Sequence, residues 1–544
     1  MNKLNLKRFC LMVDCSRNAV LSVPEIKRWV DRCLRLGYNA LMIYMEDTYE
    51  ISDNIYFGYG RGRYSKAELK EIDAYGQANG VEIIPFVQTL AHIEQIFRWR
   101  DYSDLCDIDD ILLTDCDATY RLIEGMFDTL AECFTTRTVN VGMDEAKRIG
   151  RGRYYDLHGD ARHLDLLLKH TERVARIAAK HGFEILMWSD MFFTLASGSD
   201  SYFNPAAKID PLVGSLIPDN AHLIYWDYYK RSAKEYATML RAHSALCDGC
   251  WYAGGVWTWD GFAPQNRYSI ASISENLAAC SECGTENVII TTWGDGGGEC
   301  SVAAALPSLF YAAQLVGGES DPEVIKERFH LEYGIEFDSF MLIDEVTRDI
   351  DDVCYLSPSK YLLYNDPFLG ILDSTVPNGC AEDYSIIADL VEPLRHNAEY
   401  GYLFEVTYRL CLAVSHKCDV GIRIRRAYRE KAYDTLRALA DELIHIRELV
   451  EDFYRALEKR WMRENKPHGF EVQQIRLGGL MLRLVSCAER LRGLADGRMT
   501  VIEELESEPI DVHGTSDRPY GEKRYLRYNK WHEIVTAGHI SVGT

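Results

Sequence analysis

The stretch Thr138-Val-Asn-Val-Gly-Met-Asp144-Glu145-Ala146 carries the strongest fold signal in this chain. It begins with β-favouring and small residues and runs directly into two adjacent carboxylates. A strand that is apolar along its length and acidic at its end is typical of a parallel barrel, which presents charged side chains at its mouth. Because neighbouring side chains of a strand point to opposite faces, we expect Asp144 and Glu145 to have different roles.

Seven further segments of this kind alternate with helical patterns over residues 1–320. The eight expected strands cover residues 9–15, 40–46, 82–89, 138–144, 184–190, 222–228, 253–259 and 287–293. Two of the helices between them are expected to begin at capping boxes, Ser22-Val-Pro-Glu25 and Ser65-Lys-Ala-Glu68, and to end at Gly37 and Gly80. Eight βα units in succession predict an α/β protein with a parallel (β/α)8 TIM barrel.

The pattern changes after residue 320, where apolar residues recur at helical spacing and charged residues occupy the opposite face. Helices are expected over residues 322–332, 338–353, 382–415, 419–463 and 470–496, with a loop over 356–377. No Gly/Ser-rich linker separates them from the barrel. We therefore predict a packed, mainly α-helical C-terminal domain over residues 321–544, with a possible strand pairing near its end.

Composition restricts the partners and the compartment. A formal net charge of −23 and a pI near 5.1 argue against nucleic acid or an anionic membrane as the main partner. No signal-peptide or membrane-spanning pattern is present. The 16 cysteines are scattered, which favours reduced thiols and a cytoplasmic protein. Two CxxC pairs, Cys247 with Cys250 and Cys280 with Cys283, leave a structural zinc site open, although their separation exceeds the usual spacing.

In such a barrel, functional side chains lie at the carboxyl ends of the strands. Here those positions hold acids, one arginine, one histidine and a tryptophan on each of the last four strands. Indole faces stack on sugar rings, while carboxylates and arginine bind sugar hydroxyls, so the combination predicts a carbohydrate site. The residues expected to bind substrate are Arg17, Glu46, His92, Trp188, Trp226, Trp257, Trp293 and Asp295. Glu299 is expected to cap the next helix, outside this site.

Several of these segments carry a family resemblance. They are Asp14-Cys-Ser-Arg17, Pro85-Phe-Val-Gln-Thr-Leu-Ala-His92, Asn140-Val-Gly-Met-Asp-Glu145 and Trp293-Gly-Asp295. They resemble signature segments of glycoside hydrolase family 20, the β-N-acetylhexosaminidases. Asn140 and Met143 depart from that family's His-x-Gly-Gly-Asp-Glu signature, in which they replace the His and the second Gly. The chain looks closest to small bacterial N-acetylglucosaminidases that have a helical domain after the barrel.

The resemblance implies a retaining, exo-acting enzyme in which the acetamido group of the substrate is the nucleophile. Glu145 would be the general acid and base, and Asp144 would orient the acetamide N–H. Tyr228 is our choice for the tyrosine that contacts the acetamide carbonyl, with Tyr229 as the alternative. The implied substrate is a small glycan with a terminal N-acetylhexosamine, GlcNAc or GalNAc. No cofactor or metal is implied, and a homodimer is possible.

Two other interpretations remain open. One is a retaining barrel glycosidase with a carboxylate nucleophile, for example Glu145 acting with Asp295, which would also cleave sugars without an acetamido group. The other is a carbohydrate-binding protein without catalytic activity, and the intact pair of Asp144 and Glu145 argues against it. A metal-dependent hydrolase is disfavoured because His92 is the one histidine at a strand end.

Overall fold

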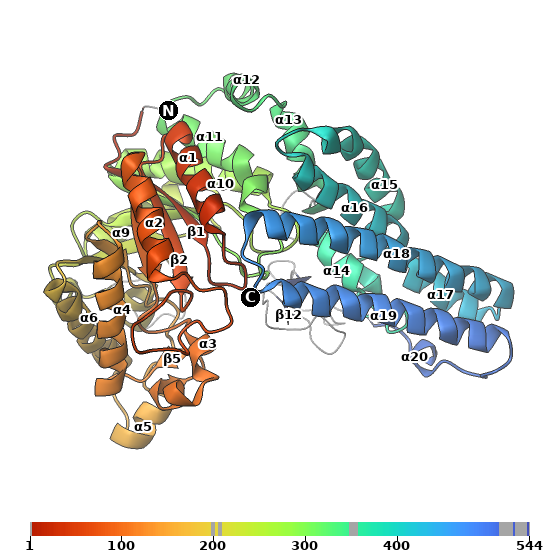
Figure 1. Ribbon diagram of the computed structural model, residues 1–544, viewed down its shortest axis with the longest axis horizontal. Helices are drawn as coiled ribbons and strands as arrows, with labels where there is room; N and C mark the ends of the chain where they lie inside the picture. The colour runs from red at the N-terminus through yellow and green to blue at the C-terminus, as the bar shows by residue number, and fades with distance from the viewer. Residues whose placement is uncertain are drawn as a thin grey trace.

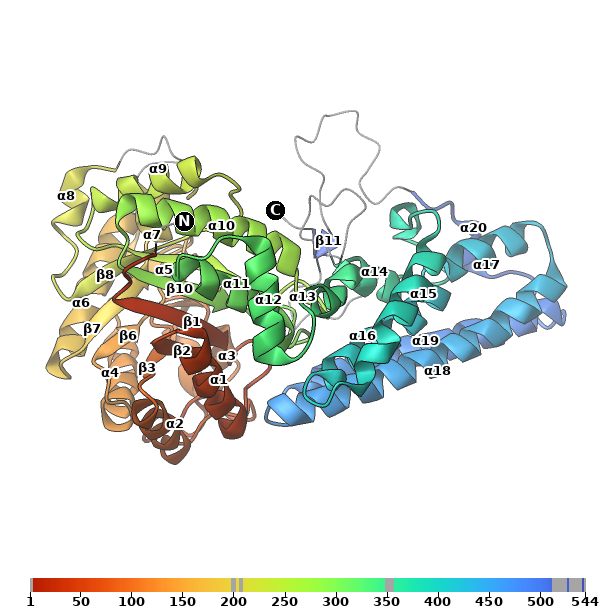
Figure 2. The same cartoon turned by 90° about the horizontal axis from the view of Figure 1, so that it is seen from above.

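The computed structural model describes residues 3–196, 202–204, 209–347 and 357–510, and two short strands, β11 (Leu526–Arg527) and β12 (Ser541–Val542). A barrel forms the first part of the chain and a group of helices forms the second, as Figure 1 and Figure 2 show. β11 and β12 pair in an antiparallel manner, in agreement with the strand pairing expected near the end of the chain.

The barrel consists of eight parallel strands. They are β1 (Arg8–Asp14), β2 (Ala40–Glu46), β3 (Glu82–Val87), β6 (Thr138–Asn140), β7 (Glu184–Trp188), β8 (Ala221–Trp226), β9 (Trp251–Gly255) and β10 (Asn287–Thr292). They close in the order β1-β10-β9-β8-β7-β6-β3-β2, which confirms the predicted TIM barrel. Several strands end two to four residues earlier than expected, so most of the expected site residues lie on loops, while Glu46, Trp188 and Trp226 end their strands.

Helices cover the outside of the barrel (Figure 1). The longer ones are α1 (Val23–Leu36), α2 (Lys66–Ala78), α4 (Asp117–Cys133), α6 (His163–Lys180), α9 (Ala233–Ser244), α10 (Asn266–Cys283) and α11 (Leu306–Val316). Shorter elements within the loops are α3 (Glu94–Phe97), η1 (Arg100–Leu105), the hairpin β4 (Cys106–Ile108) and β5 (Ile111–Leu112), α5 (Arg153–His158), α7 (Asp190–Ala196), α8 (Pro211–Gly214) and η2 (Val302–Ala305).

The two expected capping boxes differ. At the start of α2, Ser65 and Glu68 form the complete reciprocal box. At the start of α1, the Ser22 side chain accepts from the Glu25 N–H, but the Glu25 carboxylate instead binds Arg32 at 2.9 Å. Glu25 is buried, so the ion pair compensates the loss of its hydration.

The second part of the chain is helical. Its elements are α12 (Pro322–Tyr333), α13 (Phe337–Phe340), η3 (Met341–Thr347), α14 (Pro358–Tyr364), η4 (Asp373–Thr375), α15 (Cys380–Val391), η5 (Glu392–His396), α16 (Gly401–Lys417), α17 (Val420–Arg429), α18 (Tyr433–Glu464), α19 (Phe470–Ala495) and α20 (Glu503–Glu506). α18 and α19 form a long antiparallel pair that reaches the barrel at one end (Figure 1).

Two of the helices expected in this part are each divided. Pro393, in η5, separates α15 from α16, because proline cannot donate the hydrogen bond that a continuous helix needs. Lys431, with φ of +54°, separates α17 from α18. The loop expected over 356–377 contains α14, and the end of the helix expected over 338–353 lies outside the described residues.

The interior of the barrel is apolar and becomes aromatic toward the carboxyl ends of the strands. There Phe86 packs against Trp188, with ring centroids 5.7 Å apart, and Trp188 packs against Trp293 at 6.2 Å. These rings form the floor on which the loops after the strands assemble. Across the described residues, no helix has the length and apolar character needed to cross a membrane.

Candidate active site

A cavity of about 260 Å³ opens at the carboxyl ends of the barrel strands. It is lined by Arg17, Asp144, Glu145, Trp188, Trp226, Tyr228, Tyr229, Trp259, Trp293 and Asp295. Its volume lies slightly below the range of about 300–1,000 Å³ that is usual for ligand pockets. A cavity of this size favours one small ring over a polymer segment.

The two acids follow a tight turn after β6. Asn140 ends the strand, and its side-chain oxygen accepts from the Gly142 N–H at 3.0 Å. Gly142 has φ of +68°, and a Cβ there would lie 1.9 Å from Gln88 Oε1, so this position requires glycine. Met143 and Glu145 also have positive φ values, of +69° and +55°. The backbone, rather than strand alternation, therefore sets the directions of the two acids.

Asp144 is a fixed carboxylate. Gln88 Nε2 donates to its Oδ1 at 2.9 Å, and His92 Nε2 lies 3.2 Å from its Oδ2. Burial works to raise the pKa of Asp144, but the charge and hydrogen bond of His92, together with the Gln88 bond, bring that pKa below its ordinary value. Asp144 can therefore accept a hydrogen bond and stabilise a nearby positive charge.

Glu145 has a different environment. Its side chain is 53% exposed, against 13% for Asp144. Its backbone N–H donates to Asp190 Oδ2 at 2.9 Å. Asp190 is buried, and burial together with the charge of Asp144 raises the pKa of Asp190 to about 8. Glu145 is thus anchored by its backbone, while its carboxylate faces solvent and the cavity.

His92 lies between acids. Its Nε2 is 3.2 Å from Asp144 and 3.7 Å from Glu145 Oε2, and its Nδ1 is 3.7 Å from Asp110 Oδ2. Burial works to lower the pKa of His92, but the Asp144 charge and hydrogen bond and the Glu145 charge raise it well above its ordinary value. His92 is therefore a cation that supports the acid pair from behind, and it does not line the cavity.

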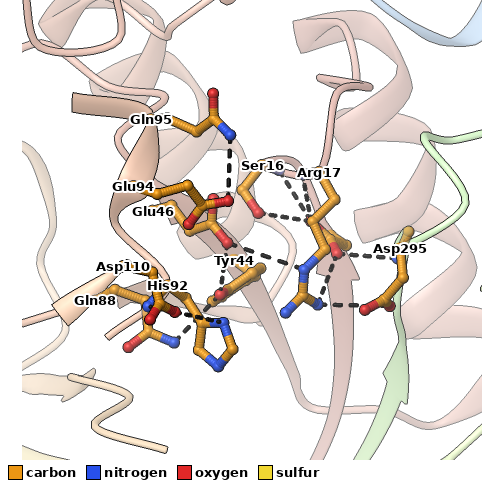
Figure 3. Close-up of polar contacts among 12 residues, drawn as sticks. Ser16, Arg17, Tyr44, Glu46, Gln88, His92, Glu94, Gln95, Asp110 and Asp295 are labelled. Carbon is orange, nitrogen blue, oxygen red and sulfur yellow. Dashed lines mark hydrogen bonds and ion pairs between the residues drawn. The ribbon is translucent and has the colours of Figure 1, made fainter. Parts of the chain in front are cut away.

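Arg17 occupies the opposite wall, with Asp295 on one side and Glu46 on the other (Figure 3). Arg17 Nη1 lies 3.4 Å from Asp14 Oδ2 and 3.6 Å from Asp295 Oδ2. The guanidinium carbon lies 4.7 Å from the centroid of the Trp293 ring. This arrangement presents a cation and a carboxylate, side by side, to a polar ligand.

Glu46 lies behind Arg17 and does not line the cavity. Figure 3 shows that Glu46 contacts both Tyr44 and Arg17. Its Oε1 accepts from the Tyr44 hydroxyl at 2.9 Å and lies 3.9 Å from Arg17 Nε. Burial raises the pKa of Glu46 to about 8, against the opposing charges of Arg17 and Arg61. Glu46 therefore approaches Arg17 from the side away from the cavity.

Aromatic rings form the remaining walls. Trp188, Trp226 and Trp293 line the cavity as predicted, together with Tyr228. Trp293 Nε1 donates to the Tyr228 hydroxyl oxygen at 3.0 Å, and that bond does not use the proton of the phenol. Burial raises the pKa of Tyr228, so the phenol stays protonated and can donate. The indole N–H of Trp188 has no hydrogen-bond acceptor among the described residues.

Trp257 does not line the cavity, whereas Trp259 does. The Trp257 ring is buried and stacks on Trp259, with centroids 4.4 Å apart and an interplanar angle of 28°. Its indole N–H donates to the Tyr228 carbonyl at 3.3 Å. The strand was expected to continue to residue 259, but β9 ends at Gly255, so both tryptophans lie on the loop after it.

Three further polar residues contribute that were not predicted for the site. Gln88 and Asp190 hold the acid pair, and Asp14 holds Arg17. Each lies at a strand end, which is the one sequence signal that could have identified them. Their roles depend on loop conformation, which strand patterns do not encode.

Among the described residues, no group of three or more His, Cys, Asp and Glu side chains is placed to hold a metal ion. Cys247 and Cys250 hydrogen-bond to each other, and Cys283 Sγ donates to the Ala237 carbonyl at 3.8 Å. The two CxxC pairs therefore do not meet in a four-thiol cluster.

Two family models match the chain. The catalytic domain of glycosyl hydrolase family 20 matches residues 10–244, and the glycoside hydrolase 20C C-terminal domain matches residues 338–523. The first match begins within β1, extends past β8 and contains the Asp144–Glu145 pair. The second begins within α13 and contains the helices from α14 to α20.

Curated relatives share part of this chain. Hexosaminidase D of Bos taurus is 27% identical over 202 residues, which are 36% of this chain and 55% of that protein. Hexosaminidase D of Homo sapiens is 26% identical over 203 residues, which are 36% of this chain and 39% of that protein. The chain thus matches about half, or less, of the length of these relatives.

Solved structures are also similar to this chain. An N-acetyl-beta-hexosaminidase from Streptomyces plicatus, in complex with Thio-NAglucal, is 18% identical and superposes with a TM-score of 0.44. The match covers 63% of this chain and 69% of that chain.

Proposed function

Because the chain belongs to glycoside hydrolase family 20, we propose that it is a β-N-acetylhexosaminidase. It would remove a terminal, non-reducing N-acetylglucosamine, or N-acetylgalactosamine, from small glycans. The small volume of the cavity supports exo action on a single terminal sugar.

One observation carries this proposal: adjacent carboxylates reach the same cavity from different environments. Asp144 is buried and bonded to Gln88 and His92, while Glu145 is more than half exposed. A fixed carboxylate suits orientation of the acetamide N–H and stabilisation of positive charge. An exposed carboxyl group suits exchange of protons with a leaving group and with water.

In the proposed mechanism, the acetamide oxygen of the substrate attacks the anomeric carbon while the glycosidic bond breaks. Glu145 gives its proton to the departing oxygen, and a cyclic oxazolinium forms. Asp144 accepts a hydrogen bond from the N–H of this ring and stabilises its charge, and the hydroxyl of Tyr228 donates to the acetamide oxygen. Glu145 then takes a proton from water, which opens the ring at the anomeric carbon with net retention.

The other cavity residues would bind the sugar itself. Arg17 and Asp295 lie 3.6 Å apart and together offer a donor and an acceptor to outer hydroxyls. Trp188, Trp226 and Trp293 enclose the acetamido group and the apolar faces of the ring. In this proposal Glu46 and His92 act from behind the cavity, on Arg17 and on the acid pair.

The alternative, in which Asp295 is a covalent nucleophile, has less support. Asp295 lies beside the Arg17 guanidinium, which neutralises its charge and lowers its nucleophilicity. No acetamido group is needed in that mechanism, so the two interpretations predict different substrates.

The test compares an aryl β-N-acetylglucosaminide with the aryl β-glucoside. Wild type should hydrolyse the first and leave the second uncleaved. Glu145→Gln should lower kcat by about 10²–10⁴-fold, the usual contribution of a general acid and base. Glu172→Gln is the matched control, because Glu172 is an exposed carboxylate of α6 that pairs with Arg176.

The proposal also includes a cytoplasmic location, which rests on the thiols. All cysteines within the described residues are free, and most are buried.

In the activity test, equal turnover of both aryl glycosides would contradict the acetamide mechanism and favour a carboxylate nucleophile. Full activity in Glu145→Gln would exclude Glu145 as the acid.

A further inference from the structure

The loop after β10 connects the cavity to the helical part of the chain. This loop, residues 293–299, carries Trp293 and Asp295 into the cavity. Arg476 of α19 donates through Nη1 to the Gly296 carbonyl at 3.2 Å. Arg460 of α18 donates to the Gly298 carbonyl at 3.0 Å. Two arginines from outside the barrel thus hold the backbone directly after Asp295.

A buried charge cluster fixes the end of the same loop. Glu299 Oε1 lies 2.7 Å from Arg476, and Glu299 Oε2 lies 2.5 Å from Lys360 Nζ of α14. The side chains of all three residues are at most 1% exposed. Burial of charge is costly unless every charge is paired, so this cluster forms only when the helices are docked on the loop. Glu299 is therefore not a simple helix cap, as its sequence position suggested.

The loop after β1 is attached to the same helices. Asn18, directly after Arg17, donates through Nδ2 to the Gly297 carbonyl at 3.2 Å and to the Gly469 carbonyl at 2.8 Å. Gly469 precedes α19, and a Cβ there would lie 2.3 Å from the Asn18 carbonyl oxygen. The turn between α18 and α19 therefore packs directly on the loop that carries Arg17.

These contacts converge on one pair of side chains. Arg17 is carried by the β1 loop and Asp295 by the β10 loop, and the Asn18 amide joins the two loops to each other and to α19. Figure 1 and Figure 2 show the ends of α18 and α19 that meet the barrel. The separation of Arg17 and Asp295 thus depends on helices far along the chain.

We propose that the helical part of the chain, through Arg476, Glu299 and Asn18, positions the Arg17–Asp295 pair and thereby sets the affinity for the terminal sugar. These three are positioning residues, since none of them lines the cavity. The inference rests on the proposed function, because it assigns Arg17 and Asp295 to the sugar. It assigns the helices a role in substrate binding beyond packing.

The principal test is Arg476→Met, with Asn18→Gly as a second variant. Arg476→Met removes both bonds to the loop but leaves Glu299 paired with Lys360, so no unpaired charge is buried. Asn18 has φ of +79°, so glycine keeps the backbone conformation and removes only the amide. Arg483→Met is the matched control on α19, because Arg483 pairs with Asp366 and not with the loop.

Both test variants should raise KM for the aryl β-N-acetylglucosaminide by about tenfold, with kcat within about threefold of wild type. This is the result expected when an interaction that stabilises the bound substrate and the transition state equally is weakened. Arg483→Met should leave KM unchanged. Arg476→Met should have a smaller effect when combined with Asp295→Asn than alone, because it acts through Asp295. A purely structural role would lower the melting temperature and the active fraction without changing KM.

An unchanged KM in both test variants would overturn the inference, as would full additivity with Asp295→Asn. If Arg476→Met does not fold, Asn18→Gly decides the question alone. If wild type does not cleave the aryl substrate, the proposed function fails, and N-acetylglucosamine binding is measured instead by tryptophan fluorescence. A weaker Kd in the variants would then still support positioning, whereas unchanged Kd values, or a wild type that binds no sugar, would reject it.

Discussion

Replacing Tyr228 with phenylalanine tests the part of the mechanism that distinguishes it from ordinary glycoside hydrolysis. The hydroxyl of Tyr228 is proposed to donate to the acetamide oxygen as that atom becomes the nucleophile. Removal of one donor to such a site costs about 10²–10³-fold in kcat. Tyr228 is buried and accepts from Trp293 at 3.0 Å, so its position is fixed before the substrate binds.

The same substitution has a second effect that can be measured separately. Trp293 is 8% exposed, and Tyr228→Phe removes the acceptor of its indole N–H. An unsatisfied buried donor lowers the free energy of unfolding by about 1–3 kcal/mol. We therefore expect a lower melting temperature together with the loss of kcat. A loss of kcat in the fraction that remains folded cannot be attributed to unfolding.

The assay measures kcat and KM for the aryl β-N-acetylglucosaminide in Tyr228→Phe and in Tyr229→Phe. Tyr229 is the matched control, since it also lines the cavity and follows Tyr228 in the chain. Tyr228→Phe should lose kcat by at least about 10²-fold, while Tyr229→Phe should remain within about threefold of wild type. The reverse result would identify Tyr229 as the donor. Small effects in both variants would refute a tyrosine donor altogether.

Two further variants test Asp144 itself and Asp190, which binds the backbone of Glu145. Burial raises the pKa of Asp190 to about 8 in the folded protein, whereas in the unfolded chain this pKa has its ordinary, lower value. The free energy of unfolding should therefore fall as the pH rises from the lower pKa to the higher one. Asp190→Asn keeps an acceptor for the Glu145 N–H and should reduce this dependence of stability on pH. Melting curves recorded across the pH window would measure it, and an unchanged dependence would exclude Asp190 as its source. Asp144→Asn should lower kcat by about 10²–10³-fold on the acetamido substrate. The same variant should lower the pKa of His92, because the negative charge of Asp144 raises that pKa in wild type. NMR titration of the histidine would measure this shift, and an unchanged pKa would contradict it.

The barrel could be predicted from the sequence because strand and helix periods are local signals. All eight strands fall within a few residues of the expected ranges, and β2 has the expected limits. Prediction was poorer where one residue interrupts a regular pattern. Pro393 and Lys431 each divide a helix whose apolar spacing continues across the break.

The candidate site was predicted less completely because its residues lie beyond the strand ends. Alternation along a strand predicts Trp226 and Tyr228 on one face, but β8 ends at Trp226, and Tyr229 lines the cavity together with both. Trp257 and Trp259 would lie on the same face of a continued strand, so alternation could not show that Trp259, and not Trp257, lines the cavity. The contacts of Glu299 could not be predicted either, because its partners Lys360 and Arg476 are distant in the chain.

The different environments of Asp144 and Glu145 follow from the turn rather than from the strand. Met143 occupies the position of the second glycine in the family signature, and its φ is +69°. Glycine adopts this conformation freely, whereas methionine adopts it at a cost of about 1 kcal/mol or more. Glu145 has φ of +55°, and its N–H bond to Asp190 compensates part of that strain. These two positive φ values, one on each side of Asp144, direct Asp144 inward to Gln88 and leave the Glu145 carboxylate exposed. The prediction of separate roles therefore rests on this turn and not on strand alternation. A change at Met143 or Asp190 should disturb both acids, even though neither residue lines the cavity.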